Sequence, residues 1–283
     1  AWQDSVAAPF RAHGIATFPN EGEAIAVLAQ VAGHTALMRA PRTAWPDLPG
    51  VQVPAGAQGF LNEVDSLGLL AHHGVPTVPL RLCRTADEAR AAFDAIGAPA
   101  VVKACSADVP HKSEHGLVAL GVQTREQAAG LFERFWAKMD AMGARRDGVI
   151  VAATRKARRE FMVGARMDPV FGPVVVVGDG GKYVEALKDC AVLLPPFSEQ
   201  DVQAALRTLR IAPLLGGERG EPPSRIAVAA GRVIAGARGA IASLDLNPVM
   251  VGAAGEGAVV VDALVEDQNN SCKRFPVKRC NLF

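Results

Sequence analysis

The sequence predicts an α/β protein in which helices and strands alternate along the chain. From residue 60 onward, segments with helical periodicity alternate with short apolar runs typical of strands. The composition agrees with this class, because apolar residues make up 49% of the 283 residues and aromatic residues only 5%. This balance is typical of Ala-rich helices packed on sheets, and a chain of this length forms one large domain or two with a substantial core.

The first sixty residues predict a small element pair followed by a linker. Residues 14–19 read as a short strand, and a helix is expected to begin near Asn20, with apolar residues at helical spacing. Prolines and glycines then crowd residues 41–59. This composition is typical of a linker between folded parts.

Residues 60–147 predict a β-α-β-β-α unit. Thr85 and Thr124 are expected to begin two of its helices, with Glu88 and Gln127 completing capping boxes. The expected elements are a helix over 61–73, a strand over 74–80, a helix over 86–96, a strand ending on Lys103, a strand over 117–122 and a helix from 125 to about 142. Together they form a small α+β unit.

Residues 148–266 predict further strands and two helices. The strands over 148–153 and 160–167 are expected to form an antiparallel pair joined by the basic turn 155–159, and the β-branched run 174–177 is typical of a buried central strand. The remaining expected elements are helices over 198–209 and 223–237 and strands over 242–251 and 258–263. Residues 267–283 lack periodicity and are expected to form a flexible tail.

Charge and cysteine content exclude several classes of function. The net charge is +1, which argues against nucleic acid or a membrane surface as a partner, and the short basic turn at 155–159 is expected to be solvated. The first thirty residues lack a basic segment followed by an apolar one, so we expect a cytoplasmic protein. Five scattered cysteines, with no C-x-x-C pair, indicate neither a disulfide framework nor a zinc knuckle.

The stretch 99–118, PAVVKACSADVPHKSEHGLV, is the first candidate site. A short strand ends on Lys103, and a turn-rich loop then presents His111, Lys112 and Gly116. Lysine is a strong point charge for phosphate, and histidine can carry a proton or a phosphoryl group near neutral pH. The alternative is a buried strand with a snorkelling lysine beside a solvated loop. Zinc at His111 and His115 is not expected, because a third ligand is missing nearby.

A second candidate site is a metal pair on the last two predicted strands. Pairing those strands would bring Asn247 and Asp262 together as oxygen ligands on one face. Mg²⁺ keeps several waters and takes few protein ligands, so two such oxygens and nucleotide phosphates would complete its shell. The alternative is that Asn247 begins a turn and Asp262 only ends a strand.

The glycine-rich segment GDGGK at 178–182 could place backbone N–H groups around phosphates. It matches neither the P-loop spacing nor the dinucleotide-binding spacing, and a simple turn is the alternative. The nearby Glu185 and Asp189 are candidates for a metal or for a solvated helix face.

Taken in order, four segments resemble a known family. They are GVPTVPLRLCRTADEA, PAVVKACSADVPHKSEHGLV, REFMVGARMDPVFGPVVVVGDGGKYVEALKD and LDLNPVMV followed by VVVDALV. The chain resembles the ATP-grasp half of the NDP-forming acyl-CoA synthetases, relatives of the succinyl-CoA synthetase β subunit. The resemblance implies an ATP-grasp domain over 60–266, with lobes of about 60–147 and 148–266 around a nucleotide cleft. Residues 1–40 resemble the tail end of a CoA-ligase region.

The resemblance also implies roles for individual residues. Lys103 and Lys112 would hold the phosphates of ATP, and His111 would relay a phosphoryl group. The other implied contacts are Glu160, Gly180, Gly181 and Glu185 with the nucleotide, and Asn247 and Asp262 with Mg²⁺. The implied reaction joins an acid and CoA with the cleavage of ATP to ADP and phosphate. It would proceed through an acyl phosphate, and a phosphohistidine on the CoA-ligase side would carry the phosphoryl group between sites. The CoA-binding domains or subunit would be the partner, and an oligomer is expected in the full enzyme.

Two departures from the family pattern leave alternatives open. Leu117 stands where relatives carry glycine, which raises the question of whether the loop closes as theirs does. Ala152 and Ala153 stand where relatives carry Glu or Gln, and losing that polar contact would weaken nucleotide binding by about 1–3 kcal/mol. The alternatives are a non-catalytic, synthetase-like regulatory module of a protein acetyltransferase and an ATP-grasp ligase of another class, such as a carboxylate–amine ligase.

Overall fold

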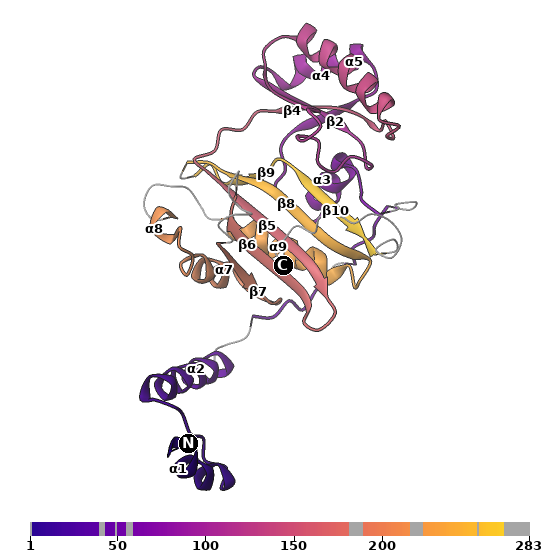
Figure 1. Cartoon of the computed structure of the whole chain (residues 1–283). Helices are drawn as coiled ribbons and strands as arrows, with labels where there is room; N and C mark the ends of the chain where they lie inside the picture. The colour runs from indigo at the N-terminus through magenta and orange to yellow at the C-terminus, as the bar shows by residue number, and fades with distance from the viewer. Residues whose placement is uncertain are drawn as a thin grey trace. The chain divides into compact units, whose positions relative to one another are not determined.

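The computed structural model describes residues 2–39, 43–48, 50–54, 59–180, 189–215, 223–253 and 255–268 (Figure 1). The chain divides into two compact units, Ala1–Thr43 and Ala44–Phe283. The first unit contains α1 (Trp2–Ala12) and α2 (Glu21–Arg39), so the helix predicted from Asn20 is confirmed. The strand predicted over 14–19 is wrong, because its residues are exposed there and join no sheet in the described part of the chain.

The first lobe of the second unit is an antiparallel sheet covered by two helices. Its described strands are β1 (Leu80–Cys83), β2 (Ala100–Cys105), β3 (Val118–Val122) and β4 (Gly148–Ala153), in the order β1-β4-β2-β3. The two helices, α4 (Ala86–Ile96) and α5 (Arg125–Ala141), lie together on one face (Figure 1). Side chains alternate along β4, so Val149 and Val151 join the core under the helices and Ile150 and Ala152 face the other way.

The predicted helix starts are confirmed by their caps. The Thr85 side chain accepts a hydrogen bond from the backbone N–H of Glu88, and Thr124 forms a complete capping box with Gln127. The capping box predicted at Thr85 is incomplete, because the Glu88 carboxylate accepts from the N–H of Arg84 instead. Ser198 likewise caps α7 (Glu199–Leu206), which ends earlier than predicted. Such caps satisfy backbone donors that the helix itself leaves unpaired.

The second lobe is a larger antiparallel sheet with helices packed against it. In the described residues the strand order is β10-β8-β5-β6-β7, and β9 pairs with β8. The strands are β5 (Arg159–Asp168), β6 (Gly172–Asp179), β7 (Cys190–Leu193), β8 (Ile241–Val251), β9 (Ala258–Val260) and β10 (Ala263–Asp267). Its helices are α3 (Glu63–His72), α7, α8 (Ala212–Leu215) and α9 (Ser224–Gly236). The run 174–177 is buried in β6 between two strands, as predicted.

The strand pair predicted from 148–153 and 160–167 is wrong. β4 pairs with β1 and β2, whereas β5 pairs with β6 and β8. The basic segment 155–158 is therefore a connection between the two sheets rather than the tip of a hairpin. For the same reason the first lobe extends to Ala153 instead of ending at 147, and α3 packs with the second sheet. The strand predicted over 74–80 begins only at Leu80, after an isolated bridge at Thr77.

The region predicted as a linker packs against α9 where it is described. Val51 is buried in the second-lobe core, and its N–H donates to the carbonyl of Gly236. The Trp45 ring meets Phe197 edge-on at 5.4 Å between centroids. A Cβ on Gly231 would lie 2.9 Å from that Trp45 ring, so the glycine makes room for it. The proline and glycine content of this segment is typical of a linker, but Trp45 and Val51 pack it against the core.

The first residue of the predicted tail, Asp267, is the last residue of β10. Asp267 is buried in β10, and its N–H donates to the carbonyl of Gly59 at 2.7 Å. The rest of the predicted tail, 269–283, lies outside the described residues.

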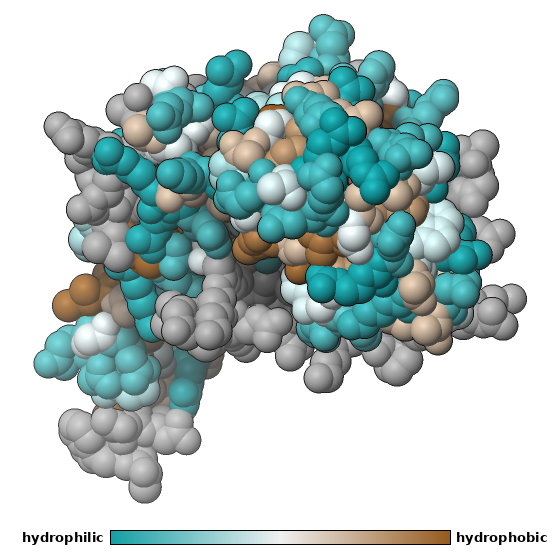
Figure 2. Space-filling model, turned by 90° about the horizontal axis from the view of Figure 1, so that it is seen from above, coloured by the Kyte–Doolittle hydropathy of each residue, from teal (hydrophilic) through white to brown (hydrophobic). Residues whose placement is uncertain are grey.

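Seen from the side of α4 and α5, the surface of the first lobe is mostly hydrophilic (Figure 2). Among the described residues, no helix is long and apolar enough to cross a membrane.

Candidate functional site

Lys103 lies on the face of the first sheet that turns away from α4 and α5. Along β2, Val102 and Ala104 join the core under those helices, while Cys105 belongs to a separate apolar cluster on the opposite face. Side chains alternate along a strand, so Lys103 projects on the same face as Cys105. The strand thus delivers the predicted lysine into the space between the two lobes.

Lys112 is fixed by a loop that closes on itself. The N–H of Leu117 donates to the Lys112 carbonyl at 2.9 Å, and the Leu117 carbonyl accepts from the N–H of Ala104 at 2.9 Å. The Leu117 side chain is fully buried in the first-lobe core. The loop therefore closes with leucine in the place of the family's glycine, and the concern about this departure is not supported.

Glu63 completes the cluster and was missed by the sequence analysis. It is the first residue of α3, whose N-cap Asn62 accepts from the backbone N–H of Asp65 at 3.0 Å. The Ser66 hydroxyl accepts from the N–H of Val265 at 3.2 Å, which ties the helix to β10. A carboxylate in the first turn is also favoured by the helix dipole. An acidic first turn is common on solvated helices, so the sequence alone offers little to single out Glu63.

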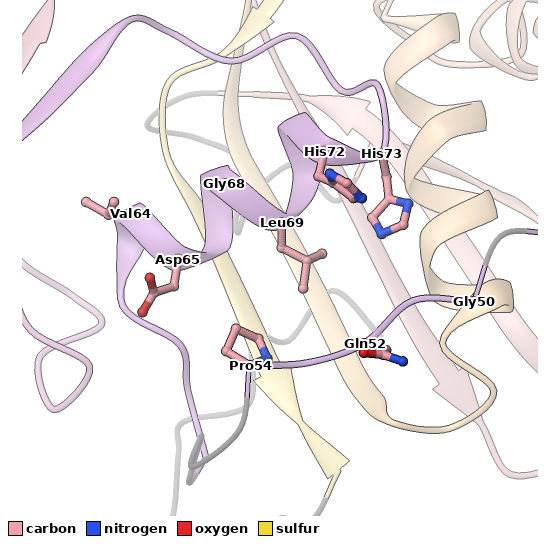
Figure 3. Close-up of a pocket in the computed structure, with 9 residues that line it drawn as sticks. All are labelled: Gly50, Gln52, Pro54, Val64, Asp65, Gly68, Leu69, His72 and His73. Carbon is pink, nitrogen blue, oxygen red and sulfur yellow. The ribbon is translucent and has the colours of Figure 1, made fainter.

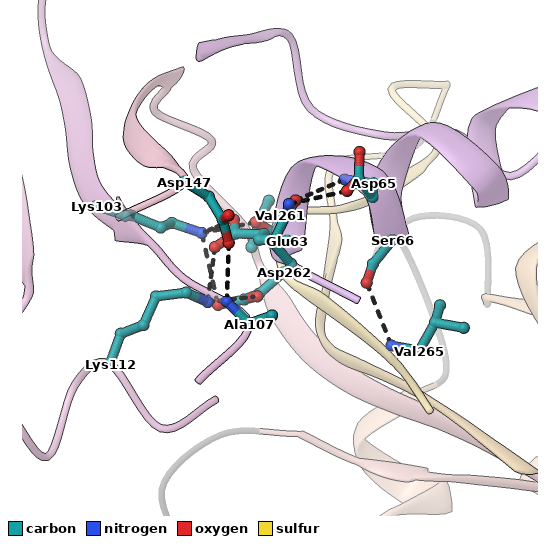
Figure 4. Close-up of polar contacts among 11 residues, drawn as sticks. Glu63, Asp65, Ser66, Lys103, Ala107, Lys112, Asp147, Val261, Asp262 and Val265 are labelled. Atoms are coloured by element: carbon teal, nitrogen blue, oxygen red, sulfur yellow. Dashed lines mark hydrogen bonds and ion pairs between the residues drawn. The ribbon is translucent and has the colours of Figure 1, made fainter. Parts of the chain in front are cut away.

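Two lysines and two carboxylates meet between the lobes (Figure 4). The Lys103 ammonium lies 2.8 Å from one Glu63 carboxylate oxygen and 2.8 Å from the Val261 carbonyl. The Lys112 ammonium lies 2.8 Å from the other Glu63 oxygen. Both ammonium groups lie 3.6 Å from the oxygens of Asp262. The lysines come from the first lobe and the carboxylates from the second, so this charged cluster joins the two lobes.

Asn247 and Asp262 lie between two stretches of paired strand. Val249 pairs with Val260 on one side of them and Leu246 with Ala263 on the other. This register leaves Asn247 and Asp262 facing each other across the interruption between β9 and β10. Their joint use as oxygen ligands stays a prediction.

Asp245 is a further acidic group on this face, two residues before Asn247. Burial and the nearby Asp262 carboxylate raise the pKa of Asp245 to about 6, while His111 opposes that rise. His111 is exposed, and it lies within electrostatic range of the Asp245 carboxyl group. The sequence analysis passed over Asp245, although its period-two spacing from Asn247 was a usable signal.

The charges of the cluster shift one another's pKa values. Burial alone would lower the pKa of Lys112, but the carboxylates of Glu63 and Asp262 outweigh burial and raise it. Burial and the neighbouring Glu63 carboxylate raise the pKa of Asp262 in spite of the two lysines. Lys112 therefore stays charged near neutral pH, and Asp262 holds its charge less firmly than an exposed aspartate.

The structure describes part of the predicted glycine-rich segment. Gly180 donates its N–H to the Glu160 carbonyl at 2.8 Å. A Cβ on Gly180 would lie 2.7 Å from backbone atoms of Glu160 and Phe161, so this close approach requires glycine. Gly181 and Glu185 lie outside the described residues. Asp189 does not act as the predicted metal or helix-face residue, because its carboxylate accepts from the backbone N–H groups of 210 and 211.

Ala152 is part of a small apolar cluster on the cleft side of the first sheet, with Val78, Cys105 and Ile150. The polar side chain that relatives carry at this position is thus replaced by apolar surface.

A separate hollow of about 550 Å³ lies between residues 50–54 and α3, and neither Lys103 nor Lys112 lines it (Figure 3). Among the described residues, Cys83, Cys105 and Cys190 are free thiols.

The comparisons with known proteins agree with this geometry. Residues 52–266 match the family model of the ATP-grasp domain, which is the class that the two lobes and their charged cluster define. Trans-feruloyl-CoA synthase from an unknown prokaryotic organism is 35% identical over 261 residues, covering 89% of this chain and 36% of that protein. The β subunit of the ADP-forming acetate–CoA ligase II of Pyrococcus furiosus is 32% identical over 222 residues, covering 76% of this chain and 94% of that subunit.

Solved structures lead to the same family. The dinucleotide-forming acetyl-CoA synthetase 1 of Ca. Korarchaeum cryptofilum, solved with coenzyme A and Ca-AMPCP, has a TM-score of 0.65 and 31% identity over 74% of this chain and 93% of that one. Another structure of that protein, with coenzyme A and Mg-AMPPCP, has a TM-score of 0.59 and 28% identity over 75% and 94%. The chain belongs to the ATP-grasp family, among the ADP-forming acid–CoA ligases. It corresponds to their β-subunit portion and spans about a third of the length of trans-feruloyl-CoA synthase.

Proposed function

We propose that this chain binds Mg-ATP between its lobes and passes a phosphoryl group through His111, as the ATP-dependent portion of an acyl-CoA synthetase. The observation that carries the proposal is the charged cluster, in which Lys103 and Lys112 lie against Asp262. His111 lies within electrostatic range of Asp245 in the same region. Two buried cations next to a set of oxygen ligands form a suitable environment for a metal-bound polyphosphate.

The residues present fit Mg²⁺ as the accompanying ion. Asn247 and Asp262 offer an amide and a carboxylate oxygen at facing positions, and Asp245 adds a second carboxylate on that face. Within the described residues, no group of three or more His, Cys, Asp or Glu side chains is arranged to hold a metal. This suits Mg²⁺, which is commonly held by one or two carboxylates plus substrate phosphates and water. When bound, the ion would neutralise phosphate charge.

In this proposal Lys103 and Lys112 hold the phosphates, while Glu160 and Gly180 border the nucleotide. Gly181 and Glu185 are proposed at the phosphate end as well, on the resemblance alone. A His111 nitrogen attacks the γ-phosphorus of ATP, so that an N–P bond forms while the bond to the bridging oxygen breaks and ADP leaves. The imidazole then releases its other proton to solvent.

The later steps need groups outside this chain. The carboxylate of the acid takes the phosphoryl group to give an acyl phosphate, and the CoA thiol displaces phosphate to give acyl-CoA. We propose CoA-binding domains or a CoA-binding subunit as the partner, an oligomer in the full enzyme, and a cytoplasmic location where ATP and CoA are available. The β subunit of Pyrococcus furiosus, which the chain matches over most of its length, supports a partner subunit.

The relatives reported above are named as CoA ligases or synthases, which favours an enzyme over the regulatory module of an acetyltransferase. The apolar Ala152 is the observation that favours the module, because it removes a polar contact to the nucleotide. A carboxylate–amine ligase is disfavoured by His111, since such ligases transfer phosphate directly to the carboxylate.

The test is phosphoryl transfer to the purified chain. With Mg²⁺ and [γ-³²P]ATP, we expect an acid-labile label on the chain and its loss in His111→Asn. His115→Asn is the matched control, because His115 lies four residues further along the same loop and is exposed too. It should keep the label. An acid-stable label, or a label that survives in His111→Asn, would refute the relay. Failure to bind ADP in a Mg²⁺-dependent way by calorimetry would refute nucleotide binding.

A further inference from the structure

We propose that Glu63 is a positioning residue that holds Lys103 and Lys112 as a charged pair for the phosphates of the nucleotide. This inference rests on the proposed function and deepens it. Glu63 belongs to the second lobe, yet each of its carboxylate oxygens lies 2.8 Å from one of the two lysines of the first lobe. One carboxylate thus sets the separation between the two ammonium groups.

The two carboxylates of the cluster are not equivalent. The Glu63 side chain is 1% exposed, whereas that of Asp262 is 33% exposed. The Asp262 oxygens lie 3.6 Å from the ammonium groups, beyond ordinary hydrogen-bond distance. Asp262 can therefore turn toward a metal ion at little cost. Glu63 has the short contacts and stays with the lysines.

Glu63 is held in place by its helix (Figure 4). The Asn62 cap fixes the first turn of α3, and Ser66 ties the next turn to β10. Leu67 and Leu70 are buried against the second-lobe core on the same helix. The Glu63 carboxylate is therefore fixed by its helix, and it holds the two lysine ammonium groups in position.

The charge balance of the cluster depends on Glu63 once Asp262 serves a metal. Lys103 and Lys112 would then be two buried cations with one full counter-charge between them. Without Glu63, the two ammonium groups would repel each other with no short contact between them, and their side chains would move apart.

Glu63→Gln tests this role, because it keeps the shape of the side chain and removes its charge. We would measure the affinity of the full chain for Mg-ADP and for adenosine, which lacks the phosphates, each as a ratio to wild type. We expect the variant to bind Mg-ADP at least 10-fold more weakly and to bind adenosine as wild type does.

Asp65→Asn is the matched control, since it makes the same chemical change on the exposed side of α3. It should follow wild type with both ligands. Failure of wild type to bind Mg-ADP would count against the proposed function and not against Glu63. If wild type binds, a Glu63→Gln ratio near one for Mg-ADP overturns the inference. An equal loss of adenosine affinity also overturns it, since that is the mark of a structural role alone.

Glu63→Asp keeps the inference testable if the glutamine variant does not fold. It retains the charge and withdraws the carboxylate by one methylene. We expect several-fold weaker Mg-ADP binding and unchanged adenosine binding. Wild-type affinity in Glu63→Asp would overturn the claim that Glu63 sets the positions of the two lysines.

Discussion

Leu117 offers a sharp test of the first-lobe core, because it stands where relatives carry glycine. Its side chain is fully buried in the cluster that contains Phe132 and Phe135. Truncating a buried leucine to alanine costs about 2–5 kcal/mol, depending on how far the site collapses. Leu117 ends a loop whose backbone can relax in part, so we expect Leu117→Ala to lower the free energy of unfolding by about 3 kcal/mol. Leu117→Gly should cost up to about 1 kcal/mol more.

Urea unfolding followed by tryptophan fluorescence measures this change. Trp136 stacks on Phe132 at 5.3 Å between ring centroids and reports on the first lobe. Replacing Trp2 and Trp45 with phenylalanine leaves Trp136 as the one tryptophan that contributes to the fluorescence. Leu120→Ala is the control, because Leu120 lies on β3 and is 77% exposed. Its effect should stay within about 0.5 kcal/mol.

Two results would refute this reasoning. If Leu117→Ala and Leu120→Ala destabilise the chain equally, Leu117 is not a core residue. If Leu117→Gly stabilises the chain, the leucine is a defect in the loop instead of an adaptation of the core.

Two further predictions concern the second lobe. The folded-state pKa of Asp245 is raised to about 6, so its stabilising contribution is full below its unfolded value near 3.8 and is lost as the pH rises through about 6. The stability of wild type relative to Asp245→Asn, by urea unfolding, should therefore fall from pH 5 to pH 7.5, and parallel curves would contradict this. Gly180→Ala should cost about 1–3 kcal/mol, because its Cβ would meet backbone. In a thermal unfolding comparison, Gly68→Ala, in open space on α3, should be neutral or stabilising, and equal losses would contradict the crowding at Gly180.

Features determined by local chemistry could be predicted from the sequence. Thr85, Thr124 and Ser198 begin helices because their side chains satisfy nearby backbone donors, and this depends on neighbours within four residues. The antiparallel pairing of residues 249–251 with 258–260 could be predicted because a short glycine-rich turn joins the two strands.

Features determined by distant contacts could not be predicted in this way. β4 and β5 have the alternation of a hairpin, but each finds its partners elsewhere in the chain. Trp45 lies among prolines that suggest a linker, although its ring packs against Phe197. Glu63 is 40 residues from Lys103 in the sequence, and their hydrogen bond exists only once the lobes have met.

The connection between the sheets decides how the lobes can move. The chain enters the first lobe at 76–79 and leaves it after Ala153, whose N–H donates to the Pro79 carbonyl at 3.0 Å. The entering segment is also hydrogen-bonded to Val260 of β9 in both directions, at 2.9 Å each. The two connections between the lobes are therefore hydrogen-bonded to each other and to the second sheet along one edge. Sliding of one lobe past the other would have to break these hydrogen bonds, whereas a rotation about this edge would leave them in place.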